Sequence, residues 1–302
     1  MSNGQKEPIT IRQLMAHTAG LEGESHTGFR GYYRDKDAEI RETNEQISRL
    51  KDQLQVGPNK KIEQQIVNLE IALNHAEERA VKQQLPTVDE IIKGEGTNSP
   101  PAQNFMQPGA EFAYTGGGAM ILQTIIETIL NEKDFGKVVD ARVFSKLGMK
   151  QSTFSPDEHE IVDGYIQTGN PLPGGWMQQP ELAAAGLWST PEDLAKVLHG
   201  IQGSLSHGAF LSQASAKEMV TPYFENEMHR LNAELKNLSV NLDEERIKEI
   251  QNRLKKLHEN EVPGLGVFIE KTRDATYFYH SGSNLGFRCL MIQTIKVKAL
   301  LL

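Results

Sequence analysis

Two kinds of sequence alternate along this chain of 302 residues, and this alternation limits its possible folds more than any other feature. One kind is punctuated by Gly and Pro between short apolar runs, which is typical of a globular body with many turns. The other is rich in Gln, Glu and Lys and almost free of Gly and Pro, which favours long helices. We therefore expect a globular domain formed by residues 1–34, 85–224 and 262–302, interrupted by insertions at residues 35–84 and 225–261.

Each insertion has the pattern of a helical hairpin. In the first, apolar residues recur every three or four positions on both sides of Gly57-Pro58, a pair that cannot continue a helix. In the second, the same spacing runs on both sides of Asn241–Asp243, which offers a turn and an N-cap. Spacings that average 3.5 residues predict antiparallel coiled coils. The hairpins are either solvated arms without chemistry or arms for dimerisation or docking.

Local signals in the body predict helices first and antiparallel strands last. Thr10 and Thr87 each precede Gln or Glu by three residues, so each predicts a capping box at a helix start. The first helix should end at Gly20, a natural residue to follow a helix. Further helices are expected at residues 119–130 and from Pro191, and strands at residues 265–270, 276–280 and 288–293. This order favours an α+β fold over a βαβ repeat.

Five segments of the body carry motifs, which are ITIRQLMAHTAGL (residues 9–21), PGAEFAYTGGG (108–118), VFSKLGM (143–149), AAGLWSTPEDL (184–194) and YHSGSNLGF (279–287). Together and in this order they resemble the serine β-lactamase-related family, the penicillin-binding-protein-like serine hydrolases. That family includes class C β-lactamases, D-alanyl-D-alanine carboxypeptidases and esterases. The resemblance implies an antiparallel sheet flanked by helices, with a helical subdomain. Both hairpins interrupt it.

The resemblance also implies a site for acyl transfer through a serine. Tyr114 matches the tyrosine that moves protons, which requires nearby positive charge to lower its phenol pKa. His280, Ser281 and Gly282 match a strand motif that contacts the substrate, and the backbone N–H of Ser283 matches a donor of the oxyanion hole. His280 replaces the lysine of true β-lactamases, which favours esters or peptides over carboxylate-bearing β-lactams.

Each of these residues also has a structural interpretation. Tyr114 could be an ordinary aromatic residue of a strand, and His280 could be a hydrogen-bonded histidine inside the sheet. The resemblance makes His17 structural rather than catalytic. Gly116, where many family members have Asn, begins a Gly-Gly-Gly run that lacks the Lys-Ser/Thr of a phosphate loop.

The expected nucleophile is missing from its place in the sequence. Family members carry a Ser-x-x-Lys motif ahead of the His-Thr segment, whereas the only such spacing here starts at Ser48, inside the first hairpin. The chain also looks shortened at both ends. We therefore expect a β-lactamase-related hydrolase domain that is inactive or incomplete. One alternative is a non-enzymatic binding or scaffold protein that acts through the hairpins, and another is a hydrolase that receives its nucleophile from a separate polypeptide.

Composition excludes several other functions. The net charge of −8 and a pI near 5.7 disfavour binding to nucleic acid or to an anionic membrane. Cys289 is the only cysteine, so neither an intrachain disulfide nor a cysteine zinc site can form, and we expect no cofactor or metal. We expect no membrane span and no signal peptide in this sequence, and therefore a cytoplasmic location. The resemblance implies a different location in many cases, because family members are often periplasmic or extracellular. Expected partners are a small acyl substrate or peptide and a second copy bound through the hairpins.

Overall fold

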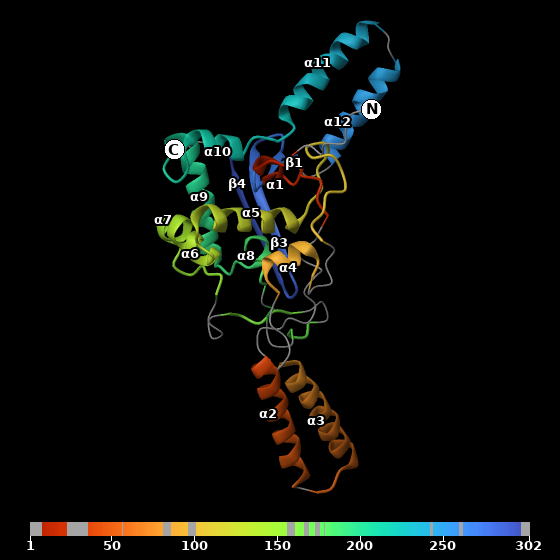
Figure 1. Ribbon diagram of the computed structural model, residues 1–302, viewed down its shortest axis with the longest axis vertical. Helices are drawn as coiled ribbons and strands as arrows, with labels where there is room; N and C mark the ends of the chain where they lie inside the picture. The colour runs from red at the N-terminus through yellow and green to blue at the C-terminus, as the bar shows by residue number, and fades with distance from the viewer. Residues whose placement is uncertain are drawn as a thin grey trace.

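The computed structural model describes residues 8–22, 36–55, 57–80, 86–95, 101–155, 161–165, 169–172, 176–177, 179–241, 244–259 and 262–296 (Figure 1). The helices of the described chain are α1 (Ile11–Met15), α2 (Lys36–Leu54), α3 (Lys60–Ala80), α4 (Val88–Lys93), α5 (Gly116–Leu130), α6 (Phe135–Val139), the π-helix η2 (Asp140–Phe144), α7 (Ser145–Leu147), α8 (Leu182–Ala185), α9 (Pro191–His207), α10 (Gln213–Met219), α11 (Glu225–Asn241) and α12 (Glu244–Glu259).

One antiparallel sheet follows the helices, in the spatial order β1-β2-β3-β4. The strands are β1 (Val262–Pro263), β2 (Phe268–Lys271), β3 (Thr276–Asn284) and β4 (Phe287–Thr294). The predicted antiparallel strands and the α+β order are confirmed. The strand predicted from residue 265 begins later, because Gly266 has a φ of +74° and turns the chain before β2.

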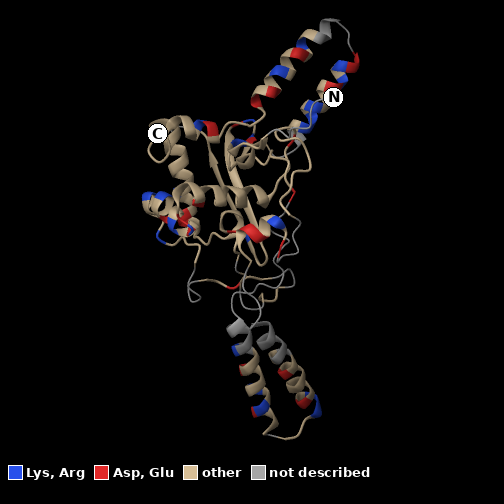
Figure 2. Ribbon diagram, in the orientation of Figure 1, with Lys and Arg blue, Asp and Glu red and all other residues tan. Residues whose placement is uncertain are grey.

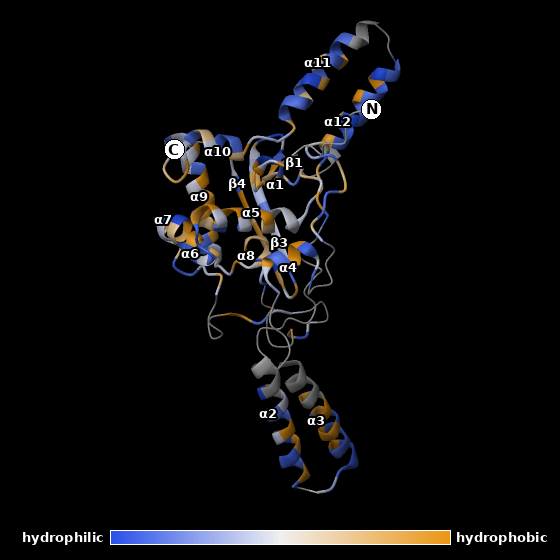
Figure 3. Ribbon diagram, viewed as in Figure 1, coloured by the Kyte–Doolittle hydropathy of each residue, from blue (hydrophilic) through white to orange (hydrophobic). Residues whose placement is uncertain are grey.

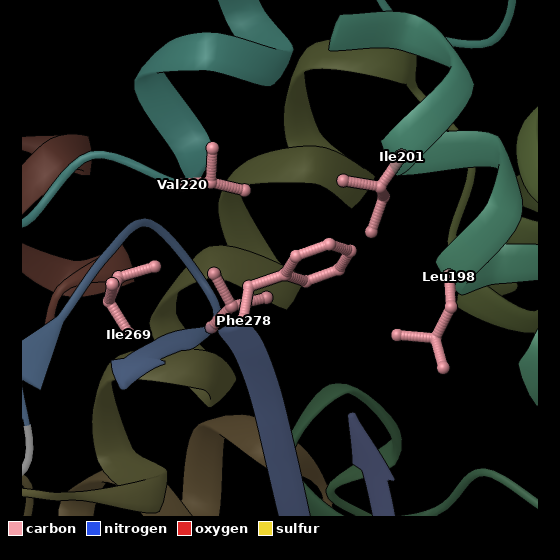
Figure 4. Close-up of a cluster of buried hydrophobic side chains, with 6 residues drawn as sticks. Leu198, Ile201, Val220, Ile269 and Phe278 are labelled. Carbon is pink, nitrogen blue, oxygen red and sulfur yellow. The ribbon is translucent and has the colours of Figure 1, made fainter. Parts of the chain in front are cut away.

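The largest core cluster joins the sheet to α9 and α10. The side chain of Phe278 on β3 is fully buried and points toward Ile201, Leu198 and Val220 (Figure 4). Complete burial of a phenylalanine stabilises a fold by about 1.5–3 kcal/mol, so this ring anchors β3. α9 begins as predicted, with Pro191 in its first turn and the Thr190 side chain as the cap.

Two helix boundaries differ from the sequence prediction. The Thr10 capping box forms, but α1 ends at Met15 and His17 already has a φ of +51°, so the chain turns before Gly20. α5 starts at Gly116 instead of residue 119, with the Thr115 side chain as its cap. Glycine is a poor helix former, which is why the sequence predicted the start of this helix only after the three glycines. Space for a side chain is limited here, because a Cβ on residue 118 would lie 3.3 Å from a backbone carbonyl of α1, that of Leu14.

The two segments predicted as insertions contain the predicted helices. α2 and α3 lie side by side and project from one end of the body, and α11 and α12 project from the other (Figure 1). Both pairs carry mixed charge (Figure 2), while the apolar residues concentrate in the body and along facing sides of the helices (Figure 3). Ile47 of α2 and Ile66 of α3 are buried. The coiled-coil seams stay predictions. None of the described helices is both long and apolar enough to cross a bilayer.

Candidate active site

Tyr114 ends an extended segment that leads into α5. The segment starts at Gly109, whose φ of +84° makes a turn that favours glycine. Two hydrogen bonds fix it against the chain that follows α1. The Gly109 N–H donates to the Thr18 carbonyl at 2.6 Å, and the Ala113 N–H donates to the His17 carbonyl at 2.8 Å. Tyr114 is 43% exposed, so the residue lies at the surface of the protein.

His17 lies directly against Tyr114. The two ring centroids are 4.3 Å apart, and the His17 Nδ1 lies 3.2 Å from the Thr115 carbonyl oxygen. Burial and, to a smaller extent, the charge of His280 lower the pKa of His17 to about 4, although the hydrogen bond to the Thr115 backbone acts in the opposite direction. His17 is therefore a neutral imidazole at neutral pH.

Phe268 of β2 connects these residues to the sheet. Its buried ring lies 6.2 Å from the ring of His17, 6.3 Å from that of Tyr114 and 5.3 Å from that of His280 on β3. Phe112 packs edge-on at 6.0 Å from the same ring. We call these five residues the Tyr114 cluster. It brings together three segments that are far apart in the sequence and includes two of the predicted site residues, Tyr114 and His280.

The edge of β3 beyond the Tyr114 cluster presents backbone donors on one side. The Ile295 N–H donates to the Thr276 carbonyl at 2.9 Å, so Thr276 and every second residue after it bond to β4. Ser281 and Ser283 are at odd-numbered positions between these residues, so their N–H groups point away from β4. β2 pairs with β3 only as far as Tyr279. Both N–H groups therefore lie on the β2 side of β3, beyond the last β2 pair.

Side chains at this edge fix the strand in place. The His280 Nδ1 lies 2.8 Å from the Ser281 carbonyl oxygen. Arg288 of β4 donates to the Ser283 hydroxyl, and the Asn284 side chain donates to a backbone carbonyl of α8, that of Ala185, at 3.0 Å. Serines 281 and 283 are exposed. Each residue of a strand advances about 3.3 Å, so Ser283 lies roughly 10 Å along β3 from His280.

The only Ser-x-x-Lys sequence is not part of this site. Ser48 is exposed on α2, and its lysine partner, Lys51, donates to Glu70 of α3 at 3.0 Å. Figure 1 shows α2 and α3 projecting away from the sheet and from α5. The structure therefore gives Ser48 no role beside Tyr114 or His280.

The sequence indicated neither the contact that His17 makes with Tyr114 nor the burial of Glu181. His17 contacts Tyr114 through a turn that only the folded chain reveals. Glu181, at the start of α8, is fully buried, and in the described part of the chain neither carboxylate oxygen has a hydrogen-bond partner. Burial raises its pKa to about 8. α8 is held against α5 by the Ala183 N–H, which donates to the Gln123 side chain at 3.0 Å. Among the described residues, no three His, Cys, Asp or Glu side chains group as metal ligands.

Comparisons with known proteins identify the family and the fold. The model of the beta-lactamase family matches residues 70–296, more than half of the chain, including the segments of Tyr114 and His280. Comparison with curated protein sequences gave no significant match.

Several solved structures resemble this fold. The D-amino acid amidase from Ochrobactrum anthropi SV3 superposes with a TM-score of 0.50, both in complex with L-phenylalanine (14% identity) and with L-phenylalanine amide (15% identity). Each match covers 94% of this chain and 63% of the amidase, so this chain spans less than two thirds of that enzyme. A beta-lactamase/D-alanine carboxypeptidase from Pseudomonas syringae gives a TM-score of 0.47 at 13% identity, covering 95% of this chain and 67% of that one.

Proposed function

The chain belongs to the beta-lactamase family, and from this membership we propose that it is the Tyr114-bearing part of a hydrolase that transfers acyl groups to and from a serine. The observation that carries the proposal is the Tyr114 cluster beside the edge of β3. The phenol ring rests on His17 and Phe268 there, and the Ser281 and Ser283 N–H groups lie on the β2 side of the same strand.

The proposed roles follow from the chemistry of each group. Tyr114 accepts the proton of the attacking hydroxyl and returns it to the leaving group. The Ser283 N–H stabilises the oxyanion that forms on the carbonyl oxygen of the substrate. His280 contacts the substrate, together with Ser281 and Gly282. The serine oxygen bonds to the acyl carbon and the leaving group departs with the proton; water then cleaves the acyl-enzyme.

The positive charge that lowers the phenol pKa of Tyr114 must come from a group other than His17, the ring that lies against it. A phenol has a pKa near 10 when free, so an adjacent cation is needed to make it a base at neutral pH. His17 cannot supply that charge, because its pKa of about 4 keeps it neutral. We propose that the cation is the lysine of a Ser-x-x-Lys segment outside these 302 residues. This chain alone then performs no covalent step.

The test is to supply that segment. We expect a fusion of a Ser-x-x-Lys segment from a family member to the N-terminus of this chain to hydrolyse a p-nitrophenyl ester. Tyr114→Phe should lower kcat of the fusion by roughly 100-fold or more, since proton transfer contributes about that much. Tyr165→Phe, at another exposed tyrosine, is the matched control and should leave kcat unchanged. A folded fusion that hydrolyses the ester equally well without the Tyr114 hydroxyl contradicts the proposal.

A second candidate function is binding through the first hairpin. Val67 and Ile71 lie one turn apart on α3 and are 46% and 50% exposed. Two such residues form a small apolar stripe that association would bury. We expect the chain to form dimers at micromolar concentration in light scattering, and Val67→Glu with Ile71→Glu to shift it to monomer. A strict monomer before substitution rules this function out.

A further inference from the structure

The second hairpin contacts the body through an arginine of α12. The Arg253 guanidinium donates to the Ala110 carbonyl at 2.8 Å, which lies at the start of the extended segment that ends at Tyr114. The same guanidinium donates to both carboxylate oxygens of Glu227 on α11, at 2.8 and 3.1 Å. It also lies over the ring of Phe224, 5.6 Å from the centroid. Arg253 therefore joins both helices of the hairpin to the backbone of the site segment.

Neighbouring contacts bind the same segment to the hairpin. The Glu111 carboxylate lies 3.6 Å from the Lys256 amine and 4.0 Å from Arg253. Phe112 packs against the apolar cluster that the hairpin forms with the body, which includes Phe224, Leu231, Ile250 and Leu257. The ring of Phe112 also belongs to the Tyr114 cluster. One short segment thus touches the hairpin on one side and the candidate site on the other.

Hydrogen bonds to the turn after α1 hold the opposite side of this segment. Gly109 and Ala113 bond to the carbonyls of Thr18 and His17, respectively. Ala110 lies between these two anchor points, and its carbonyl accepts from Arg253. A hydrogen bond to a charged donor is roughly twice as strong as one between neutral groups. The Arg253 bond therefore adds a charge-assisted anchor to the backbone four residues before Tyr114.

We propose that Arg253 is a positioning residue for Tyr114, so that the second hairpin holds the proton-transferring phenol in place. The catalytic meaning of this position rests on the proposed function. The structural claim that Arg253 holds the segment before Tyr114 is independent of the proposed function, because it follows from contacts within this chain. The second hairpin then contributes to the site by positioning Tyr114.

The experiment observes Tyr114 directly in the full chain labelled with 3-fluorotyrosine. The chain has seven tyrosines, so Tyr114→Phe assigns the Tyr114 signal in the ¹⁹F spectrum. We expect Arg253→Gln to shift and broaden this signal, and Arg253→Lys to restore part of it, because lysine can still donate to the Ala110 carbonyl. Arg246→Gln is the matched control: Arg246 pairs with Glu234 and Glu249 inside the hairpin, at 2.8 and 3.0 Å, and its loss should leave the signal in place.

A further variant separates positioning from stability of the hairpin. Glu227→Gln weakens the ion pair between α11 and α12 but keeps the Arg253 donor to Ala110, so the Tyr114 signal should stay near that of the parent chain. An unchanged signal in Arg253→Gln overturns the proposal. Equal displacement in Arg253→Gln, Glu227→Gln and Arg246→Gln also overturns it, since the effect would then come from loosening the hairpin. An inactive fusion protein would instead contradict the proposed function and leave this result intact.

Discussion

The imidazole of His17 and the phenol ring of Tyr114 lie with their centroids 4.3 Å apart, tilted by 31°. A charged imidazolium in this place would repel the cation that tyrosine-dependent acyl transfer needs. A neutral imidazole instead supplies a flat surface, and its Nδ1 lies at the backbone of Thr115, the cap of α5. His17 thereby couples the ring of Tyr114 to the start of that helix.

We first predict that His17 stays neutral down to about pH 4. In a pH titration followed by ¹H NMR, its ring signal should be constant between pH 7 and 5, whereas in denaturant it should titrate near 6.5. The depressed pKa means that its contribution to stability is present above pH 6.5 and is lost as pH falls through 4. That contribution is on the order of 3 kcal/mol for such a shift. A folded-state midpoint above 6 would contradict the burial argument.

We next predict that Glu181 makes the protein less stable as pH rises. Its pKa of about 8 lies above the ordinary 4.5, so the folded state holds a proton that the unfolded state loses. The stabilising effect is complete below pH 4.5 and is lost as pH rises through 8, which amounts to on the order of 5 kcal/mol. In denaturant titrations, Glu181→Gln should remove the fall in stability between pH 6.5 and 8. Glu270→Gln, at an exposed carboxylate on β2, should leave the fall unchanged.

The sequence predicted those elements whose signals are local. The capping boxes at Thr10 and Thr87 formed because each pair of side chains satisfies nearby backbone donors, whatever the rest of the chain does. The start of α5 could not be predicted this way. Glycine disfavours a helix, and its use here is explained by close tertiary approaches, those of Ala102 to Gly117 and of the Leu14 carbonyl to Gly118. The length of β3 beyond His280 is likewise set by its pairing with β4.

The site was predictable only where a residue sits inside a motif. Tyr114 and His280 were found through their flanking residues, and the fold brings both to Phe268. The proposed role of Arg253 had no signal in the sequence, because a charged residue on a helix with a heptad-like pattern is usually solvated. Glu181 had none either, since burial of a carboxylate depends on packing that a single sequence does not display.

We predict that this chain by itself forms no covalent adduct with a fluorophosphonate or a fluorescent penicillin. Ser48 is exposed on a charged helix, and its lysine is engaged by Glu70, so its hydroxyl has no base to activate it. Intact-mass spectrometry after incubation should show the unmodified mass. The fusion that carries a Ser-x-x-Lys segment is the positive control. A labelled peptide containing Ser48 would refute this assignment.

Deletion of the two hairpins should affect the stability of the body to different extents. Replacement of Lys36–Ala80 by a short Gly/Ser linker removes α2 and α3, whose buried residues Ile47 and Ile66 lie within the hairpin itself, so the melting temperature of the body should hardly change. Replacement of Glu225–Glu259 removes the buried side chains of Leu231, Ile250 and Leu257 that pack with Phe224. Burial of each such side chain contributes roughly 2 kcal/mol, so this deletion should destabilise the body by several kcal/mol. Calorimetry of the two deletions compares them directly. Equal losses would show that the first hairpin is part of the core.

The last prediction concerns Gly282, which stands in the strand motif between His280 and the proposed oxyanion donor. A Cβ at this position would lie 2.6 Å from the Sγ of its β4 partner, Cys289. The Cys289 side chain is exposed and must shift to make room, so Gly282→Ala should destabilise the fold by about 1 kcal/mol, the low end of overpacking costs. Cys289→Ala in the same chain removes the obstructing sulfur and should recover about 1 kcal/mol as a coupling energy in a double-mutant cycle.

A matched control separates this clash from the general effect of replacing glycine. Gly203 in α9 has nothing within 4 Å of the Cβ position, so Gly203→Ala should stabilise the protein by about 0.5–1 kcal/mol through the lower entropy of the unfolded chain. Denaturant unfolding of all four variants measures both effects on one scale. A loss in Gly282→Ala that Cys289→Ala fails to relieve would mean that glycine is required there by backbone geometry, since the sulfur would then not be the obstacle. Relief by Cys289→Ala would instead show that the Cys289 sulfur, and not the backbone at residue 282, is the obstacle to a side chain at this point of the motif.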